Sequence, residues 1–321
     1  MAAYPKPFKD IPALLQILQQ RGMAISDAAK AARCLDRIGY YRLSGYWHPM
    51  RASTPGQTPQ DPTIIHEHFR AGTDFSQVAD LYVFDKKLRL LMLDAIERVE
   101  VSLKVQIARI LGQRDPLAHL NPAELHGNFM RKKGTGPTDH ERWINKFRQC
   151  ETRSKEDFLK PFLSQHPGFE FPIWMAVEIW DFGALSHFLA GMKIQDQASL
   201  SSNFQVPRPE LLTSWVRCFH TVRNTCAHHS RLWNRPIPDR PKPPKLGENP
   251  LLDHLAGDAH AQTRIYGVAA SLQFLIRILH PGSEWADRLK EHMRSLPQAP
   301  NVSLQTGAGF PANWETLQLW N

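Results

Sequence analysis

Apolar residues recur at helical spacing along most of this chain. The longest run covers roughly residues 76 to 111, where an apolar side chain returns every three or four positions until Gly112. Its members are Leu81, Phe84, Leu88, Leu91, Ala95, Val99 and Leu103. No strand pattern and no internal repeat persists. The pattern predicts an all-α fold, a helical bundle in which this long helix is the dominant element.

Start and stop signals predict two shorter helices at the N-terminal end. Asp10 and Pro12 open a helix at about residue 11, and Gly22 closes it. Ser26 opens the next helix, which Gly39 stops. We expect both helices to be additions to the bundle.

A second central helix is expected after Pro172. The segment from Ile173 to about Leu189 is apolar on nearly every side, which is typical of a helix buried all round. Glu178 and Asp181 are the exceptions inside it. Because burying a lone carboxylate is costly, each should be paired with a cation or hydrogen-bonded.

A basic, proline-rich stretch after the middle of the chain predicts a boundary. Residues 235–245 contain too many prolines to be helical. We therefore divide the chain into a helical core at 1–235, a connector at 236–248, and C-terminal helices with a tail at 249–321. The tail keeps large apolar residues, so we expect this last part to pack on the core. Its helices are expected at about 263–279 and 284–295.

The helical stretch at 215–229 carries the most informative polar residues. At about 100° of rotation per residue, His220, Arg223, Asn224 and His228 share one face, and His229 points roughly 120° away. A second stripe on the same helix is apolar and would bury it against a core. The members of that stripe are Trp215, Val216, Phe219 and Val222.

These polar residues suit RNA cleavage without a metal ion. Such cleavage needs a group that moves protons near neutral pH, and histidine titrates there, which makes His228 the candidate. It also needs donors for the charge on phosphorus, and the Arg223 guanidinium can supply two. Asn224 can hold the imidazole or bind a phosphate oxygen. The plainer interpretation is a structural pairing inside a helical core.

The motif Arg223-Asn224-x-x-x-His228 resembles the signature of the HEPN ribonuclease superfamily. The wider string from Arg223 to Asn234 is similar to the Abi-like proteins of bacterial abortive infection. Other segments match that family as well, so the resemblance spans nearly the whole chain. They are Ile38–Tyr46, Phe84–Leu90 with Ala95–Glu100, Pro172–Glu178, and Gly309–Trp314.

The resemblance implies a toxin-like protein of phage defence that cuts or binds RNA. HEPN proteins place two motif helices face to face, and this chain has one motif, so the resemblance implies a homodimer. Arg223, Asn224 and His228 would be catalytic, Glu178 would position Arg223, and no metal or organic cofactor would be needed. The alternatives are a non-cleaving protein that holds a structured noncoding RNA, and a helical module that binds only protein.

Composition changes this picture modestly. The chain has 321 residues, enough to bury a core, and a net charge of +8, which favours a polyanionic partner such as RNA. Its four cysteines are scattered, so we expect a reducing cytoplasm rather than a disulfide framework. No apolar run is long enough to predict export or insertion into a membrane.

Several cations are candidates for contacting RNA. Arg131, Lys132 and Lys133 lie in a glycine-containing loop that either follows an RNA backbone or is simply solvated. Arg42 sits among tyrosines and a tryptophan that either stack on bases or, as we favour, pack in the core. Arg231 follows the motif. We assign supporting roles to His220 and His229.

Two other kinds of site are not indicated. Cys218, His220, Cys226 and His228 include the usual ligands of zinc, but they are spread around one helix and cannot all converge on an ion. We interpret the two cysteines as small buried apolar residues. Glycine-rich phosphate loops are absent, so neither an NTPase nor a dehydrogenase is supported.

Overall fold

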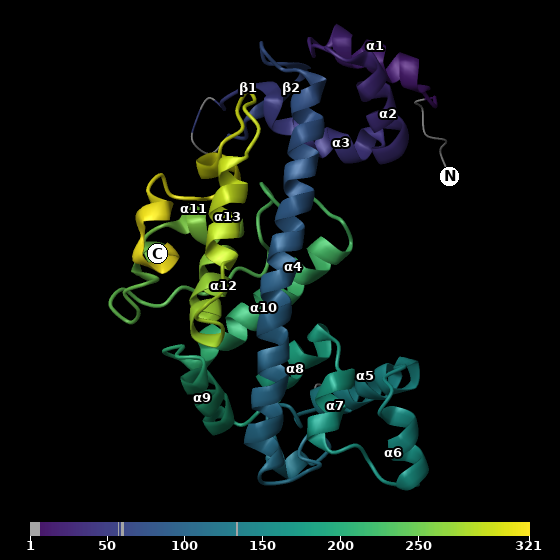
Figure 1. The fold of residues 1–321 in the computed structure, drawn as a ribbon, viewed down its shortest axis with the longest axis vertical. Coiled ribbons are helices and arrows are strands. Elements are labelled where there is room, and N and C mark those ends of the chain that lie inside the picture. Colours follow the sequence, from purple (N-terminus) through teal and green to yellow (C-terminus); the bar gives the residue numbers. More distant parts are fainter. Residues whose placement is uncertain (1–6, 57, 59–60, 133) are drawn as a thin grey trace.

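The computed structural model describes residues 7–56, 58, 61–132 and 134–321 (Figure 1). Its dominant element is α4 (Phe75–Gly112), which runs through nearly the full height of the molecule. At 1.5 Å per residue, these 38 residues span about 57 Å. The helix begins with a capping box. The side chain of Asp74 accepts from the backbone N–H of Gln77, and the side chain of Gln77 accepts from the backbone N–H of Asp74. The predicted all-α architecture is confirmed.

The N-terminal part packs against the first half of α4. It consists of α1 (Ile11–Gln20), α2 (Ala28–Ile38), α3 (Tyr40–Trp47), η1 (His48–Met50), β1 (Arg51–Thr54) and β2 (Ile64–Phe69). Asp10 caps α1 as predicted, with its carboxylate accepting from the N–H of Ala13 at 3.0 Å. Gly39 separates α2 from α3 at φ 89°, a left-handed backbone that favours glycine.

The sequence did not predict a hairpin, yet β1 and β2 pair antiparallel. Among the residues of β2, only Phe69 is buried. A strand whose two faces are both mostly exposed leaves no alternation of apolar and polar residues to read. This explains why the expectation of a chain without strands was wrong here.

Short helices surround the second half of α4. They are η2 (Pro122–Glu124), α5 (Asp139–Arg153), α6 (Leu159–Gln165), α7 (Ile173–Ile179), α8 (Phe182–Gly191) and α9 (Ile194–Asn203). The single helix predicted from Ile173 to about Leu189 is wrong, because Trp180 is extended at ψ 130° and divides it. Asp181 then caps α8, accepting from the N–H of Ala184 at 2.6 Å. An acidic residue within an apolar run here marks a new helix start.

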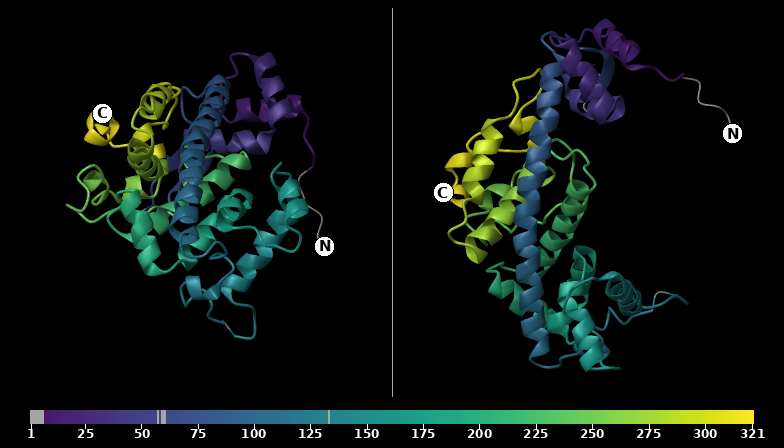
Figure 2. Two further views of the ribbon diagram at one scale, coloured as in Figure 1. Left: turned by 60° about the horizontal axis from the view of Figure 1, so that its bottom comes forward. Right: turned by 45° about the vertical axis from the view of Figure 1, so that its right-hand side comes forward.

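The C-terminal helices pack along α4. After α10 (Pro209–Ala227), the chain forms η3 (Asp253–Leu255), α11 (Ala259–Gln262), α12 (Ile265–Leu279), α13 (Trp285–Arg294), η4 (Leu304–Ala308), η5 (Trp314–Thr316) and η6 (Gln318–Trp320). Trp285 donates its indole N–H to the carbonyl of Leu91 at 2.8 Å. His292 bonds the carbonyl of Phe84 at 3.0 Å. Figure 2 shows α12 and α13 on one side of α4 and the N-terminal helices on another.

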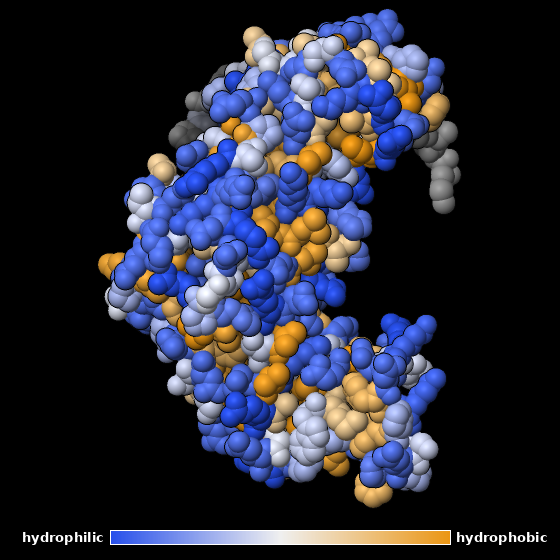
Figure 3. Space-filling model, in the orientation of Figure 1, coloured by the Kyte–Doolittle hydropathy of each residue, from blue (hydrophilic) through white to orange (hydrophobic). Residues whose placement is uncertain are grey.

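The described helices share one continuous core, and α4 contributes to it along its whole length. The molecule as a whole is curved. Its surface is hollowed between the N-terminal helices and the part that contains α5 and α6 (Figure 3), and α10 crosses α4 at the height of this hollow (Figure 1). Within the described residues, none of the helices has the length and apolar character required to span a lipid bilayer.

One buried histidine is expected to make the stability of the fold depend on pH. His119 is fully buried beside the rings of Trp143, Phe147 and Trp180, and neither of its ring nitrogens has a hydrogen-bond partner among the described residues. Burial lowers the pKa of His119 to about 3. The folded protein therefore holds this ring neutral, whereas the unfolded chain protonates it below pH of about 6.5.

We predict that this ring makes the free energy of unfolding fall as pH drops from about 6.5 towards 3, by up to about 1.4 kcal/mol per pH unit. The His119→Leu variant, which cannot bind the proton, should lose less stability over this range than the wild type. Urea unfolding at pH 7, 6 and 5 measures the slope, with His68→Leu on exposed β2 as the control. Equal slopes in the wild type and His119→Leu would contradict the assignment.

Candidate functional site

The helix α10 has one buried face and one polar face. Trp215, Val216, Phe219 and Val222 are buried, as the apolar stripe predicts. The indole N–H of Trp215 donates to the carbonyl of Lys242 at 2.8 Å, which fixes the connector against the helix. The rotation of α10 is therefore set by its packing, and the remaining polar residues are turned toward the surface.

Arg223, Asn224 and His220 form a linked group on the polar face. The amide Nδ2 of Asn224 lies 2.9 Å from Nε2 of His220, and Nη1 of Arg223 donates to Oδ1 of Asn224 at 3.4 Å. All three side chains are half-buried, so each has an exposed part. Asn224 thus lies between the cation and the imidazole and can orient both.

The two motif histidines lie just beyond the end of α10. The helix ends at Ala227, and His228 is the cap residue, whose N–H still donates to the carbonyl of Asn224 at 2.9 Å. His229 has a left-handed backbone with φ 56°. Both side chains are exposed. The predicted helix was therefore too long, and helical rotation does not set the direction of His229.

Among the described residues, no hydrogen bond or ion pair joins Glu178 to Arg223. Glu178 is exposed on α7, where it lines a surface hollow of 350 Å³ with Arg109, Gln113 and Trp174. The charge of Arg223 acts instead on Glu100 of α4. Burial raises the pKa of Glu100, and the charges of Lys104 and Arg223 oppose that rise. Lys104 forms an ion pair with Glu100 at 3.6 Å.

A second ion pair borders the same face. The ammonium of Lys146 on α5 lies 2.9 Å from the Asp181 carboxylate at the start of α8. Burial and the charge of Lys146 lower the pKa of His220, while Asp181 opposes the shift. Gly183 permits this close approach, because a Cβ there would lie 2.8 Å from Lys146 Nζ and 3.0 Å from His220 Nε2.

A buried carboxylate anchors the chain that follows the motif. Asp85 of α4 is 0% exposed and pairs with Arg89 one turn later. It accepts from the Tyr46 hydroxyl at 2.7 Å and from the N–H groups of Leu232 and Trp233, with closest distances of 3.1 and 2.7 Å. Helices α3 and α4 therefore fix the segment directly after His228.

A family comparison matches this same region. The model of a family described as Abi-like protein matches residues 33–234, which is more than half of the chain. The chain belongs to the Abi-like protein family. The matched residues include α3, α4, the polar face of α10 and the Asp85 anchor. No curated protein and no solved structure gives a significant match.

Two cations predicted to bind RNA also hold the post-motif segment of this Abi-like chain. Nη1 of Arg42 donates to the carbonyl of His229 at 2.7 Å, although the side chain is exposed. Arg231 is half-buried and donates to the carbonyl of Gly45, and burial lowers its pKa. A Cβ at Gly45 would lie 2.9 Å from that guanidinium. Both arginines donate hydrogen bonds to backbone carbonyls, which the sequence did not reveal.

Two of the predicted loop cations lie on a different segment from the motif. Arg131 and Lys132 are exposed before α5, and Lys133 lies outside the described residues. Within the described parts of the chain, no three His, Cys, Asp or Glu side chains lie where they could hold a metal ion. Cys218 and Cys226 are buried free thiols, and burial raises the pKa of each.

Sequence reasoning missed Asp85, Glu100 and Lys146 as parts of the site. A signal existed for Asp85, because Asp85 and Arg89 stand four residues apart within an apolar run and can pair on a buried helix face. Glu100 belongs to the same long helix. Which partner it meets across the fold is not readable from helical spacing.

We predict that Asp85→Asn lowers the free energy of unfolding by roughly 3–5 kcal/mol, because it leaves Arg89 as a buried, uncompensated charge. Tyr46→Phe removes only one hydrogen bond to the same carboxylate and should cost about 1 kcal/mol. Urea denaturation of both variants measures the difference. If the two variants are equally stable, Asp85 does not anchor this region.

Proposed function

We propose that this Abi-like protein is a metal-independent endoribonuclease of a bacterial abortive-infection system, acting in the cytoplasm. It cuts single-stranded RNA by attack of the 2′-hydroxyl on the neighbouring phosphorus. The observation that carries the proposal is the polar face of α10, where Arg223, Asn224 and His220 are linked and His228 stands exposed at the helix end. Family membership links the chain to abortive infection more generally.

The proposed chemistry uses these groups in defined roles. A base takes the proton of the 2′-hydroxyl, whose oxygen bonds to phosphorus while the bond to the 5′ oxygen breaks. An acid protonates that leaving oxygen, so the products are a 2′,3′-cyclic phosphate and a free 5′-hydroxyl. Arg223 donates to the phosphate oxygens, where negative charge develops. His228 transfers a proton, and Asn224 orients its neighbours.

Base and acid must act on opposite sides of the phosphorus, which argues for a dimer. In one chain His220 is half-buried and bonded to Asn224, and the two exposed imidazoles of the motif, His228 and His229, are adjacent residues at the end of one helix. We propose that two copies related by a two-fold axis bring together two motif helices around one phosphodiester. The net charge of +8 would favour RNA at such an interface.

We predict that His228→Ala lowers the cleavage rate by roughly 100-fold or more while the fold is retained, since it removes the proton carrier. His229→Ala, a change at the adjacent exposed histidine, should have a much smaller effect. Cleavage of end-labelled RNA in the presence and absence of EDTA measures both rates, and EDTA should change neither.

Other outcomes of this experiment are informative. Wild-type cleavage rates in His228→Ala would reject the assignment of the proton carrier. RNA that is bound but left intact by the wild-type protein would favour the non-cleaving alternative. A protein that neither binds nor cuts RNA would favour a protein-binding module.

We further predict that Glu100→Gln lowers kcat about tenfold with little change in KM, because Glu100 positions Arg223 without touching RNA. The pKa of Glu100 is raised, so protonation should reduce the wild-type rate on the acid side of its pH profile. Glu100→Gln should lack that decline, and Glu100→Asp should partly restore kcat. Glu178→Gln is the matched control and should behave as the wild type. The reverse result would return the positioning role to Glu178.

A further inference from the structure

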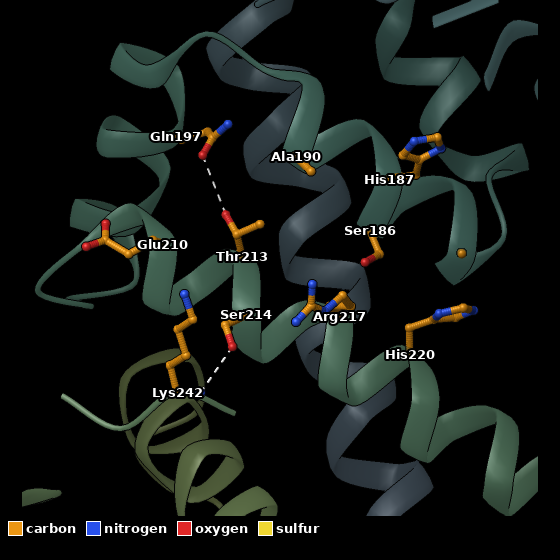
Figure 4. A pocket seen from close by; sticks show the side chains of 11 residues that line it. Ser186, His187, Ala190, Gln197, Glu210, Thr213, Ser214, Arg217, His220 and Lys242 are labelled. Carbon is orange, nitrogen blue, oxygen red and sulfur yellow. Dashed lines mark hydrogen bonds between the residues drawn. The ribbon is translucent and has the colours of Figure 1, made fainter. Parts of the chain in front are cut away.

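A pocket lies beside the motif, between α8, α9 and α10 (Figure 4). Its volume is 480 Å³, within the range of pockets that hold small ligands. Most of the residues that line it are polar or charged, although their carbon atoms form most of its exposed wall, and small residues such as Gly183 and Ala190 leave it open. His220 is part of the lining, so the pocket and the motif share a residue.

The pocket and the motif occupy one continuous face of α10. Thr213, Arg217 and His220 line the pocket at spacings of four and three residues, and Asn224 follows four residues later. Residues at these spacings lie one above the other on a helix. From Arg217 to Asn224 the distance along the axis is about 10 Å. A ligand chain that contacts Arg223 and Asn224 can therefore continue along α10 into the pocket.

Two cations project into this space from different segments. In Figure 4 the Lys242 side chain rises from below, and the Arg217 guanidinium points toward it from the other side of the view. Lys242 is fixed by its backbone, since its N–H donates to Ser214 Oγ at 3.1 Å, and the part of the chain that the structure describes contains no ion pair to its ammonium. The Arg217 side chain is 62% exposed, and its ion pair with Asp239, at 3.5 Å, is long and exposed to solvent. Such a pair is weak, so a bound anion can replace Asp239 as the partner of Arg217.

The other side of the pocket offers uncharged hydrogen-bonding groups. The Gln197 amide is anchored, with Nε2 donating to the carbonyl of Met192 at 2.9 Å and Oε1 lying 3.5 Å from the Thr213 hydroxyl. Glu210 lines the pocket close enough to Lys242 for the two charges to interact, and it already pairs with Arg208 at 2.6 Å. The two cations favour the negative end of a ligand near Arg217 and Lys242, and the uncharged groups favour a polar neutral part near Gln197 and Thr213.

We propose that this pocket binds one nucleotide of the RNA chain, with its phosphate between Arg217 and Lys242 and its nucleoside against Thr213 and Gln197. The inference deepens the proposed function and rests on RNA as the substrate of the motif. The nucleotide in the pocket fixes the position of the chain, so that a neighbouring phosphate reaches Arg223. The pocket thereby selects where RNA is held, and the motif supplies the chemistry.

The test uses full-length protein carrying His228→Ala, so that RNA stays intact. Titration calorimetry measures binding of AMP, GMP, CMP and UMP, the matching nucleosides, inorganic phosphate and a short single-stranded RNA. At least one monophosphate should bind tenfold more tightly than phosphate or its nucleoside. The double variant Arg217→Gln with Lys242→Gln should bind this nucleotide and the RNA at least tenfold more weakly.

The matched control removes two positive charges near the pocket but outside it. Arg240→Gln with Lys245→Gln changes two exposed cations of the same connector outside the pocket and should alter nucleotide binding less than twofold. Ala190→Phe fills the pocket without changing its charge, so it should abolish nucleotide binding and weaken the binding of RNA. Equal losses in both charge variants would overturn the proposal, as would phosphate binding as tightly as every nucleotide.

Three further outcomes have assigned meanings. RNA binding unchanged by Ala190→Phe would overturn the proposal even if free nucleotides bind. A glutamate-rich peptide that binds in the pocket where no nucleotide does would also overturn it, in favour of a protein partner. If nucleotide and RNA binding follow the pocket while wild-type protein fails to cut RNA, the inference stands and the proposed cleavage fails, so the two failures are distinguishable.

Discussion

The Asp85 carboxylate holds together the parts of this chain that matter for its site. It is fully buried, and a buried charge is tolerated only when cations and donors surround it. Arg89 supplies the cation from the same helix, and the donors come from Tyr46 on α3 and from the backbone at Leu232 and Trp233. Satisfying one charge thus fixes the segment after the motif against α3 and α4.

The constraint also explains how the polar face of α10 stays accessible beside a large hydrophobic core. The buried stripe of α10 sets its rotation, and the Asp85 anchor sets where its last turn lies. The cations and carboxylates of the other face then partner each other, with Glu100 near Arg223 and Lys104, and Asp181 near Lys146 and His220. These groups balance one another's charge and leave the face open to solvent. The pocket at Arg217 continues the same surface.

Much of the architecture could be predicted from local pattern. The long helix was predicted within one residue at each end, and the helices α12 and α13 within two, because their apolar spacing and terminal residues are clear. The break at Trp180 and Asp181 was missed, since an apolar run looks alike whether it forms one helix or two. The electrostatic contact of Glu100 with Arg223 was missed because Glu100 and Glu178 both stand on helices, and only the packing of those helices decides which carboxylate lies near α10.

The sequence by itself determined the all-α class, the family resemblance through residues such as Arg223 and Trp233, and the grouping of His220, Arg223 and Asn224 on one helix face. All of these depend on short-range spacing, which helical geometry converts directly into position. Only the tertiary structure decided that Asp85 anchors the post-motif segment, that Arg42 and Arg231 bond its backbone, and that a pocket opens beside His220. Each of these joins residues far apart in the chain, and their meeting depends on how whole helices pack.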